Sequence, residues 1–161
     1  GSALTINGNL AMKGTGSGND AYGVSAAQKG GYGSTKTYQA TGINIYDKDG
    51  AAFTLNGNLD MKVKGVGVDM RGSEKNAVTI AGGTIFTPDD GEEASYKAVA
   101  ATSGTFAMGM NDAKTGSNGK DVVVQGTISL GKKGTVDLGL GSSKSRWTGI
   151  ADNKDGHPMN L

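Results

Sequence analysis

The sequence predicts an all-β fold, a right-handed parallel β-helix (solenoid) with loop insertions, and three observations predict it. First, LTINGNLAMK at 4–13 nearly repeats as FTLNGNLDMK at 53–62, with weaker copies at 78–86 and 122–130. Second, each copy alternates apolar and polar residues with the period of a strand. Third, the glycines inside the copies recur at about two dozen residues or at roughly twice that spacing, which is typical of stacked coils. We expect the longer gaps to hold two coils.

Each copy is expected to form two short strands that meet at a corner. In the second copy Phe53 and Leu55 face one side of the strand, whereas Thr54 faces the other. A glycine stands where the alternation breaks, because a residue without a Cβ can bend the chain sharply at no steric cost. The corner glycines are Gly8, Gly57, Gly82 and Gly126.

Further strands are expected ahead of several copies. Short apolar alternations precede the second and third copies at 42–46 and 65–70, and 23–26 is interpreted as an earlier, degenerate copy. Polar turns rich in Gly, Asn and Asp follow at 47–50 and 72–76. Parallel strands joined by a chain that travels once around are nearly always connected in the right-handed sense, which sets the expected hand.

Composition narrows the domain organisation and the partners. The 161 residues include 29 Gly, 2 Pro and no Cys, so neither a disulfide nor a thiolate metal site holds the fold. With 16 basic and 15 acidic residues the net charge is +1, which gives no reason to expect a nucleic-acid partner. We interpret residues 1–2 as a tag remnant, 3–153 as the β-helix and 154–161 as an irregular tail.

Two long loops are the first places to look for a binding site, because recognition concentrates in loops on a repetitive scaffold. The alternative interpretation is that both are solvated insertions. The loop at 14–37 carries tyrosines, which offer large contact areas at low entropic cost. The loop at 87–96 carries carboxylates that could bind a cation or a basic surface, although such clusters usually form exposed loops. The candidate binding residues are Tyr22, Tyr32, Tyr38, Asp89, Asp90, Glu92 and Glu93.

No motif in the chain predicts catalysis, a metal site or a cofactor. The turn that begins at Asp47 resembles the start of a calcium loop, but Asn58 stands where the loop needs a bidentate acid. The single histidine, His157, lies in the tail, where a Ser-His-Asp triad would lack support. Trp147 could be a sugar-stacking platform, and packing at the end of a coil is the preferred interpretation. We therefore expect a protein that is not an enzyme.

Three segments resemble the passenger domains of bacterial autotransporters, the type V secretion proteins, and especially the pertactin-like adhesins. They are GINIYDKDGAAFTLNGNL, GVGVDMRGSEKNAVTIAGGTI and TVDLGLGSSKSRWTG. In that family an apolar-x-Leu-x-Leu run, a few Ser and Asn, and then Trp-Thr-Gly recur in coils. The matching residues here are Val136, Leu138, Leu140, Ser142, Ser143, Ser145, Trp147, Thr148 and Gly149.

The resemblance implies a fragment of a cell-surface adhesin that acts in adhesion, aggregation, biofilm formation and virulence. It implies a location at the bacterial cell surface, in the outer membrane or secreted, with the parent protein anchored by a C-terminal β-barrel that lies outside this sequence. The implied partners are a host surface protein or glycan, or other copies of the chain. The absence of cysteine agrees with secretion of an unfolded chain through a narrow pore.

Two alternatives remain open from the sequence. A polysaccharide-binding or polysaccharide-cleaving β-helix, such as a pectate lyase, would need clustered Asp with Lys or Arg on one strand face. A trimeric autotransporter head is suggested by the small residues at 98–104. Saccharide cleavage would identify the first and an obligate trimer the second.

Overall fold

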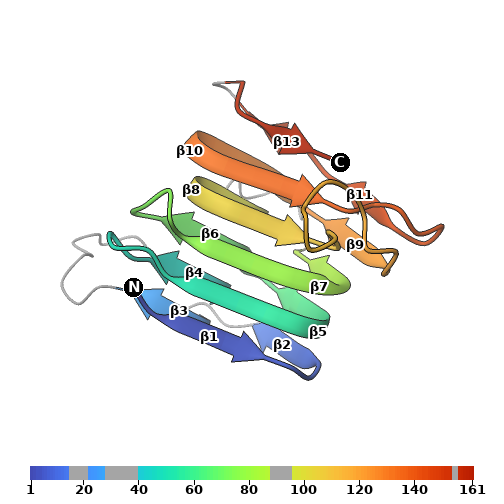
Figure 1. Ribbon diagram of the computed structural model, residues 1–161, viewed down its shortest axis with the longest axis horizontal. Coiled ribbons are helices and arrows are strands. Elements are labelled where there is room, and N and C mark those ends of the chain that lie inside the picture. The colour runs from blue at the N-terminus through green and yellow to red at the C-terminus, as the bar shows by residue number, and fades with distance from the viewer. Residues whose placement is uncertain (15–21, 28–39, 88–95, 154–155) are drawn as a thin grey trace.

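The computed structural model describes residues 1–14, 22–27, 40–87, 96–153 and 156–161, and for 22–27 it describes the backbone alone. These residues form strands and turns and no helix, and the strands stack along one direction from the N-terminus to the C-terminus (Figure 1). The named strands belong to one sheet, and every pair among them is parallel. The predicted all-β class is confirmed. The strands are β1 (Ala3–Ile6), β2 (Leu10–Gly14), β3 (Tyr22–Ala27), β4 (Ala40–Tyr46), β5 (Ala52–Val63), β6 (Gly65–Arg71), β7 (Ala77–Phe86), β8 (Lys97–Met108), β9 (Val122–Gln125), β10 (Thr127–Leu138), β11 (Arg146–Thr148), β12 (Ala151–Asp152) and β13 (Met159–Asn160).

The strands pair in three ladders. The first ladder contains β3, β4, β6, the first halves of β8 and β10, and β12. The second contains β1, the first halves of β5 and β7, the second halves of β8 and β10, and β13. The third contains β2, the second halves of β5 and β7, β9 and β11. From β4 onward the chain visits the first, second and third ladders in turn, so each turn, which we call a layer, adds one strand to each ladder until the chain ends on β13.

Apolar side chains form columns inside this stack. In the second ladder Phe53 lies in register with Val78, and Val78 with Phe106, and each of the three is at most 1% exposed. Residues of all three ladders contribute to one core cluster. Full burial of such a side chain stabilises a fold by about 1.5–3 kcal/mol, so the contacts between layers are the main source of stability.

At the corners between the second and third ladders, two glycines stand where a side chain has no room. Gly83 has a positive φ of 113°, and a Cβ at this position would collide with the backbone of Leu59 in the layer before it. A Cβ on Gly57 would likewise collide with the carbonyl oxygen of Gly8. Glycine is therefore required at these corners both for the bend and for the close approach of the layers.

A buried asparagine holds the turns between the first and second ladders. Asn76 is 1% exposed, and its Oδ1 accepts a hydrogen bond from the Ala51 amide at 2.8 Å. Its Nδ2 donates to the carbonyl oxygens of Asp47 and Arg71 at 3.1 and 2.6 Å. The turn predicted at 47–50 is present, with Asp47 Oδ1 accepting from the Asp49 amide at 2.8 Å.

Two expectations about the repeat are wrong. The gap between the first two copies holds one layer and not two, since Asn7 and Asn56, 49 residues apart, are hydrogen-bonded neighbours. The reason is that β3, which lies between these copies in the sequence, pairs with β4 in the first ladder. The copy at 122–130 is also out of phase with the others. Its Gly126 joins the third ladder to the first, whereas Gly57 joins the second to the third.

The predicted tail at 154–161 partly continues the pattern. Met159 in β13 lies in register with Val136 of β10 and adds a last strand to the second ladder. Asn160 donates to the Asp137 carboxylate at 2.6 Å, which holds that strand in place. Among the described residues no helix has the length and apolarity needed to span a membrane.

Candidate functional site

The residues that the sequence singled out for binding are largely outside the part of the chain that the structure describes. Tyr22 opens β3, where only the backbone is described. The other six candidates, at 32, 38, 89, 90, 92 and 93, lie in segments outside the described residues. The candidate surface must therefore be built from the ladders themselves.

The two residues considered for special roles are held by local contacts. Trp147 is half-buried against the core, and its indole nitrogen donates to the carbonyl oxygen of Gly126 at 3.0 Å, so the packing interpretation is confirmed. The backbone of His157 is bound at both ends by the side chain of Asn153, at 2.8 and 2.7 Å. This contact joins Asn153 to His157 ahead of β13.

The outward side of the first ladder carries a polar network that sequence reasoning missed. Asp69 pairs with Arg71 of the same strand. Further along the ladder Lys97 Nζ donates to Ser129 Oγ at 3.1 Å, and Ser129 Oγ donates to Asp152 Oδ2 at 3.3 Å. Burial raises the pKa of the Asp69 carboxyl, while the charges of Arg71 and Lys97 oppose the rise. Acidic and basic groups balance along this face.

This network meets the composition that a polysaccharide-cleaving β-helix would need, but its spacing is unsuited to a glycosidase pair. Asp69 and Asp152 stand three register steps apart, from β6 through β8 and β10 to β12. That separates their backbones by about 14 Å. Glycosidase carboxyl groups lie about 5 to 9.5 Å apart. No group of three or more His, Asp or Glu side chains gathers into a metal site within the described ranges.

The small residues that suggested a trimeric head are used inside the chain itself. Ala98, Val99 and Ala101 of β8 are fully buried and belong to the core cluster. They face the chain's own interior, where the neighbouring layers crowd them.

A groove of about 630 Å³ runs along the corner between the second and third ladders. Residues of the corner line it, and residues 119–121, which precede β9, contribute a wall. Lys120 on this wall donates from Nζ to the carbonyl oxygen of Asn56 at 3.3 Å, and Asn118 donates to that of Ala81 at 2.8 Å. These bonds fix the segment against the corner. The groove is lined by Asn9, Gly57, Asn58, Leu59, Gly83, Thr84, Gly119, Lys120 and Asp121.

A second hollow, of about 650 Å³, lies at the C-terminal end of the stack. Leu138, Leu140 and Leu161 line one side of it, and Leu161 is 65% exposed. Met110 and Lys114 line it from the segment that follows β8. Thr115, Ser117 and Asn160 add polar groups to its lining.

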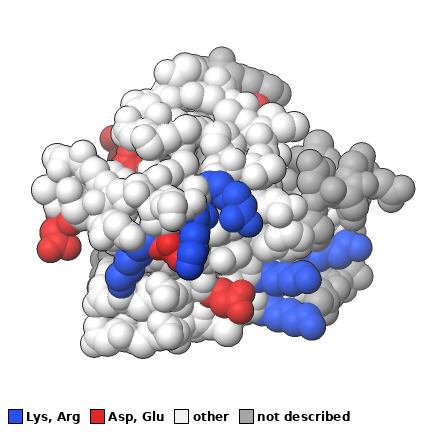
Figure 2. Space-filling view, turned by 90° about the vertical axis from the view of Figure 1, so that its right-hand side faces the viewer, with Lys and Arg blue, Asp and Glu red and all other residues white. Residues whose placement is uncertain are grey.

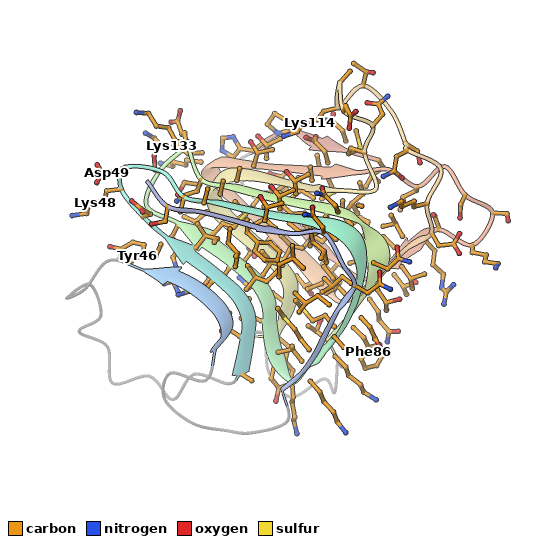
Figure 3. The ribbon with its side chains drawn as sticks, turned by 60° about the horizontal axis from the view of Figure 1, so that its bottom comes forward. Tyr46, Lys48, Asp49, Phe86, Lys114 and Lys133 are labelled. Atoms are coloured by element: carbon orange, nitrogen blue, oxygen red, sulfur yellow. The ribbon has the colours of Figure 1, made fainter. Side chains whose placement is uncertain are left out.

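Beside the corner groove, the outward side of the third ladder is basic. Lys13 lies in register with Lys62, and Lys62 with Phe86. Figure 2 looks at the side of the molecule where the third ladder lies and shows basic side chains gathered over its central and lower part, with acidic side chains beside some of them. Figure 3 places Phe86 at the outer margin of the molecule, away from the core. The outward residues are Ala11, Lys13, Asp60, Lys62, Thr84, Phe86, Val123, Gln125, Arg146 and Thr148.

The sequence held a signal for this surface. Lys13 and Lys62 occupy the same place in the two nearest copies, LAMK and LDMK. Equivalent positions of stacked copies fall in one column, so the repeat indicates that the two lysines share a column but not that they are adjacent. Phe86 was harder to assign, because an apolar residue in an alternating strand is normally taken to face the core.

Comparison with protein-family models, with curated proteins and with solved structures found no match to this chain.

Proposed function

We propose that the chain is a right-handed parallel β-helix that forms part of a bacterial cell-surface adhesin of the autotransporter class. The observation that carries the proposal is the order in which the chain visits the three ladders, because one strand of each ladder per layer is the geometry of a solenoid. A crossover between parallel strands is right-handed in nearly all proteins, which supports the hand.

Attachment follows from what such a rod presents to its surroundings. Each ladder repeats its outward side chains at one strand spacing, as in the column that joins Thr5, Thr54 and Thr79. A column of like polar groups suits many weak contacts at once, and multivalency turns weak contacts into strong attachment. The corner groove adds amide, hydroxyl and charged groups that can bind sugar or peptide polar groups.

The partners that fit this function are a host surface protein or glycan, or other copies of the chain. The proposed location is the bacterial cell surface, with a C-terminal β-barrel of the parent protein as the anchor in the outer membrane. These proposals rest on the resemblance of the three sequence segments to autotransporter passengers.

The test displays the chain on a bacterium that does not adhere by itself. Binding to glycan and matrix-protein arrays, attachment to cultured cells and settling of the suspension are measured together. We expect at least one of these to rise above a control that displays the core variant Phe106→Asp, which removes the fold. Replacing 28–39 and 88–95 by short Gly-Ser linkers keeps β3 and separates loop binding from ladder binding. The absence of every effect would overturn the proposal.

A further inference from the structure

Two lysines of the third ladder stand directly next to each other. Lys13 and Lys62 are register partners and both side chains are exposed. Neither forms an ion pair with a described residue. Like charges directly opposite each other on neighbouring strands destabilise a sheet. An anion that contacts both ammonium groups would remove this repulsion.

An aromatic ring continues the same column. Phe86 follows Lys62 in register, and Lys62 Nζ lies 5.3 Å from the centroid of the ring. Phe86 points outward and is half-buried, so part of its ring is accessible at the surface. The next residue in the column is Gln125, an exposed amide that can donate and accept hydrogen bonds. The column thus offers positive charge, an apolar ring and an amide in a line.

The charge around this column is one-sided. Arg146 adds a third basic group to the outward side of the ladder, and Asp60 is the one acidic residue among the outward positions in its described strands. The first ladder differs, because its basic groups Arg71 and Lys97 are engaged by Asp69 and Ser129. The third ladder is therefore the face whose positive charge is available to a ligand.

We propose that the column Lys13–Lys62–Phe86–Gln125 binds a linear acidic polysaccharide, with its carboxylated sugars running along the stack. Neighbouring rungs are about 4.8 Å apart, which is close to the length of one sugar ring in an extended chain. Successive carboxylates then meet Lys13 and Lys62, the apolar face of a sugar stacks on Phe86, and Gln125 binds hydroxyl groups. Asp60 in the neighbouring column accepts a further hydroxyl hydrogen bond. The inference deepens the proposed attachment function and rests on it.

The test measures binding of polygalacturonate oligomers to the whole chain by isothermal titration calorimetry at about 0.1 M salt, where the Debye length is about 10 Å. Neutral dextran and polyglutamate serve as comparison polymers. The double variant Lys13→Gln with Lys62→Gln should bind polygalacturonate about tenfold more weakly. The matched control, Lys48→Gln with Lys132→Gln, removes the same charge at two exposed positions between the first and second ladders, one in the turn after β4 and one at the register shift within β10. It should stay within about twofold of the unmodified chain, because charges beyond a Debye length are screened.

A third variant separates sugar recognition from simple charge attraction. Phe86→Leu should weaken binding of polygalacturonate several-fold while any weak binding of polyglutamate is unchanged, since a peptide offers no sugar face to the ring. Circular dichroism and thermal unfolding of each variant show whether it keeps the fold.

Three results would overturn the inference. The first is that the chain does not bind polygalacturonate. The second is that it binds polyglutamate as tightly as polygalacturonate, with the lysine double variant and Phe86→Leu each weakening the binding of both polymers equally. The third is that the matched control weakens polygalacturonate binding as much as the lysine double variant does. A chain that attaches to cells or arrays but ignores polygalacturonate overturns this inference and leaves the proposed function standing. A chain that binds polygalacturonate without attaching to any cell or array overturns the proposed function alone.

Discussion

The middle and the end of the stack show how much each layer depends on its neighbours. Phe53 and Leu4 occupy the same inward column of the second ladder, one layer apart. Phe53 is 1% exposed, whereas Leu4 in the terminal layer is 46% exposed. The strand pattern and the side-chain direction are the same in both. The difference teaches that burial in this protein is provided by the next layer and not by the residue's own strand.

The largest effect is expected from emptying the middle of a column. Phe106 is fully buried between Val78 and Val136. Phe106→Ala should lower the free energy of unfolding by about 3–5 kcal/mol, because a cavity forms that the stacked backbones cannot close. Urea unfolding followed by circular dichroism measures the loss, with Phe106→Leu as a milder control. A loss below about 1 kcal/mol would show that the column tolerates cavities.

The next effect concerns the polar link between layers. Asn76→Ala leaves the Ala51 amide and the carbonyl oxygens of Asp47 and Arg71 without this partner. We expect a loss of about 2–3 kcal/mol in the free energy of unfolding, since buried polar groups would lose their hydrogen bonds. The matched control is Asn7→Ala, which removes an exposed hydrogen bond to Asn56 and should change stability by less than about 0.5 kcal/mol. Equal losses in both would mean that burial at Asn76 is unimportant.

A pH effect is expected from the inner part of the first ladder. Burial raises the pKa of Asp69 above its ordinary 3.8, so folding favours the protonated form. The corresponding stability is fully present below pH 3.8 and is lost as the pH rises through the folded-state pKa. As the pH rises through this range, the free energy of unfolding should therefore fall less for Asp69→Asn than for the unmodified chain. Parallel pH profiles of the two proteins, measured by chemical denaturation, would contradict the raised pKa.

The smallest effect is expected at the end of the stack. Leu4→Ala removes a side chain that is already 46% exposed. The loss should be about 1 kcal/mol or less, because little apolar surface returns to water. Thermal unfolding of Leu4→Ala and Phe106→Ala under the same conditions compares the two losses of stability directly. A loss as large as that of Phe106→Ala would mean that the terminal layer is as tightly packed as the middle.

The repeat predicted more of the fold than of the binding surface. The alternation in FTLNGNLDMK placed Leu59 and Met61 inward and Lys62 outward, and their burial agrees. The prediction that Gly126 occupies the same corner as Gly57 was wrong, because a glycine between two apolar runs has the same sequence pattern at every corner. The alternation of apolar residues and the positions of glycines in the sequence do not indicate which of the three corners a residue occupies.

The sequence by itself determined the strands of the clearest copies and which side of each faces the core, because alternation acts through local backbone geometry. Only the tertiary structure decided which strands share a ladder. That choice sets Lys13 beside Lys62 and Phe86, and it sets Lys97 beside Ser129. The physical reason is that the segments between strands vary in length, so residues far apart in the chain become neighbours only when the layers close.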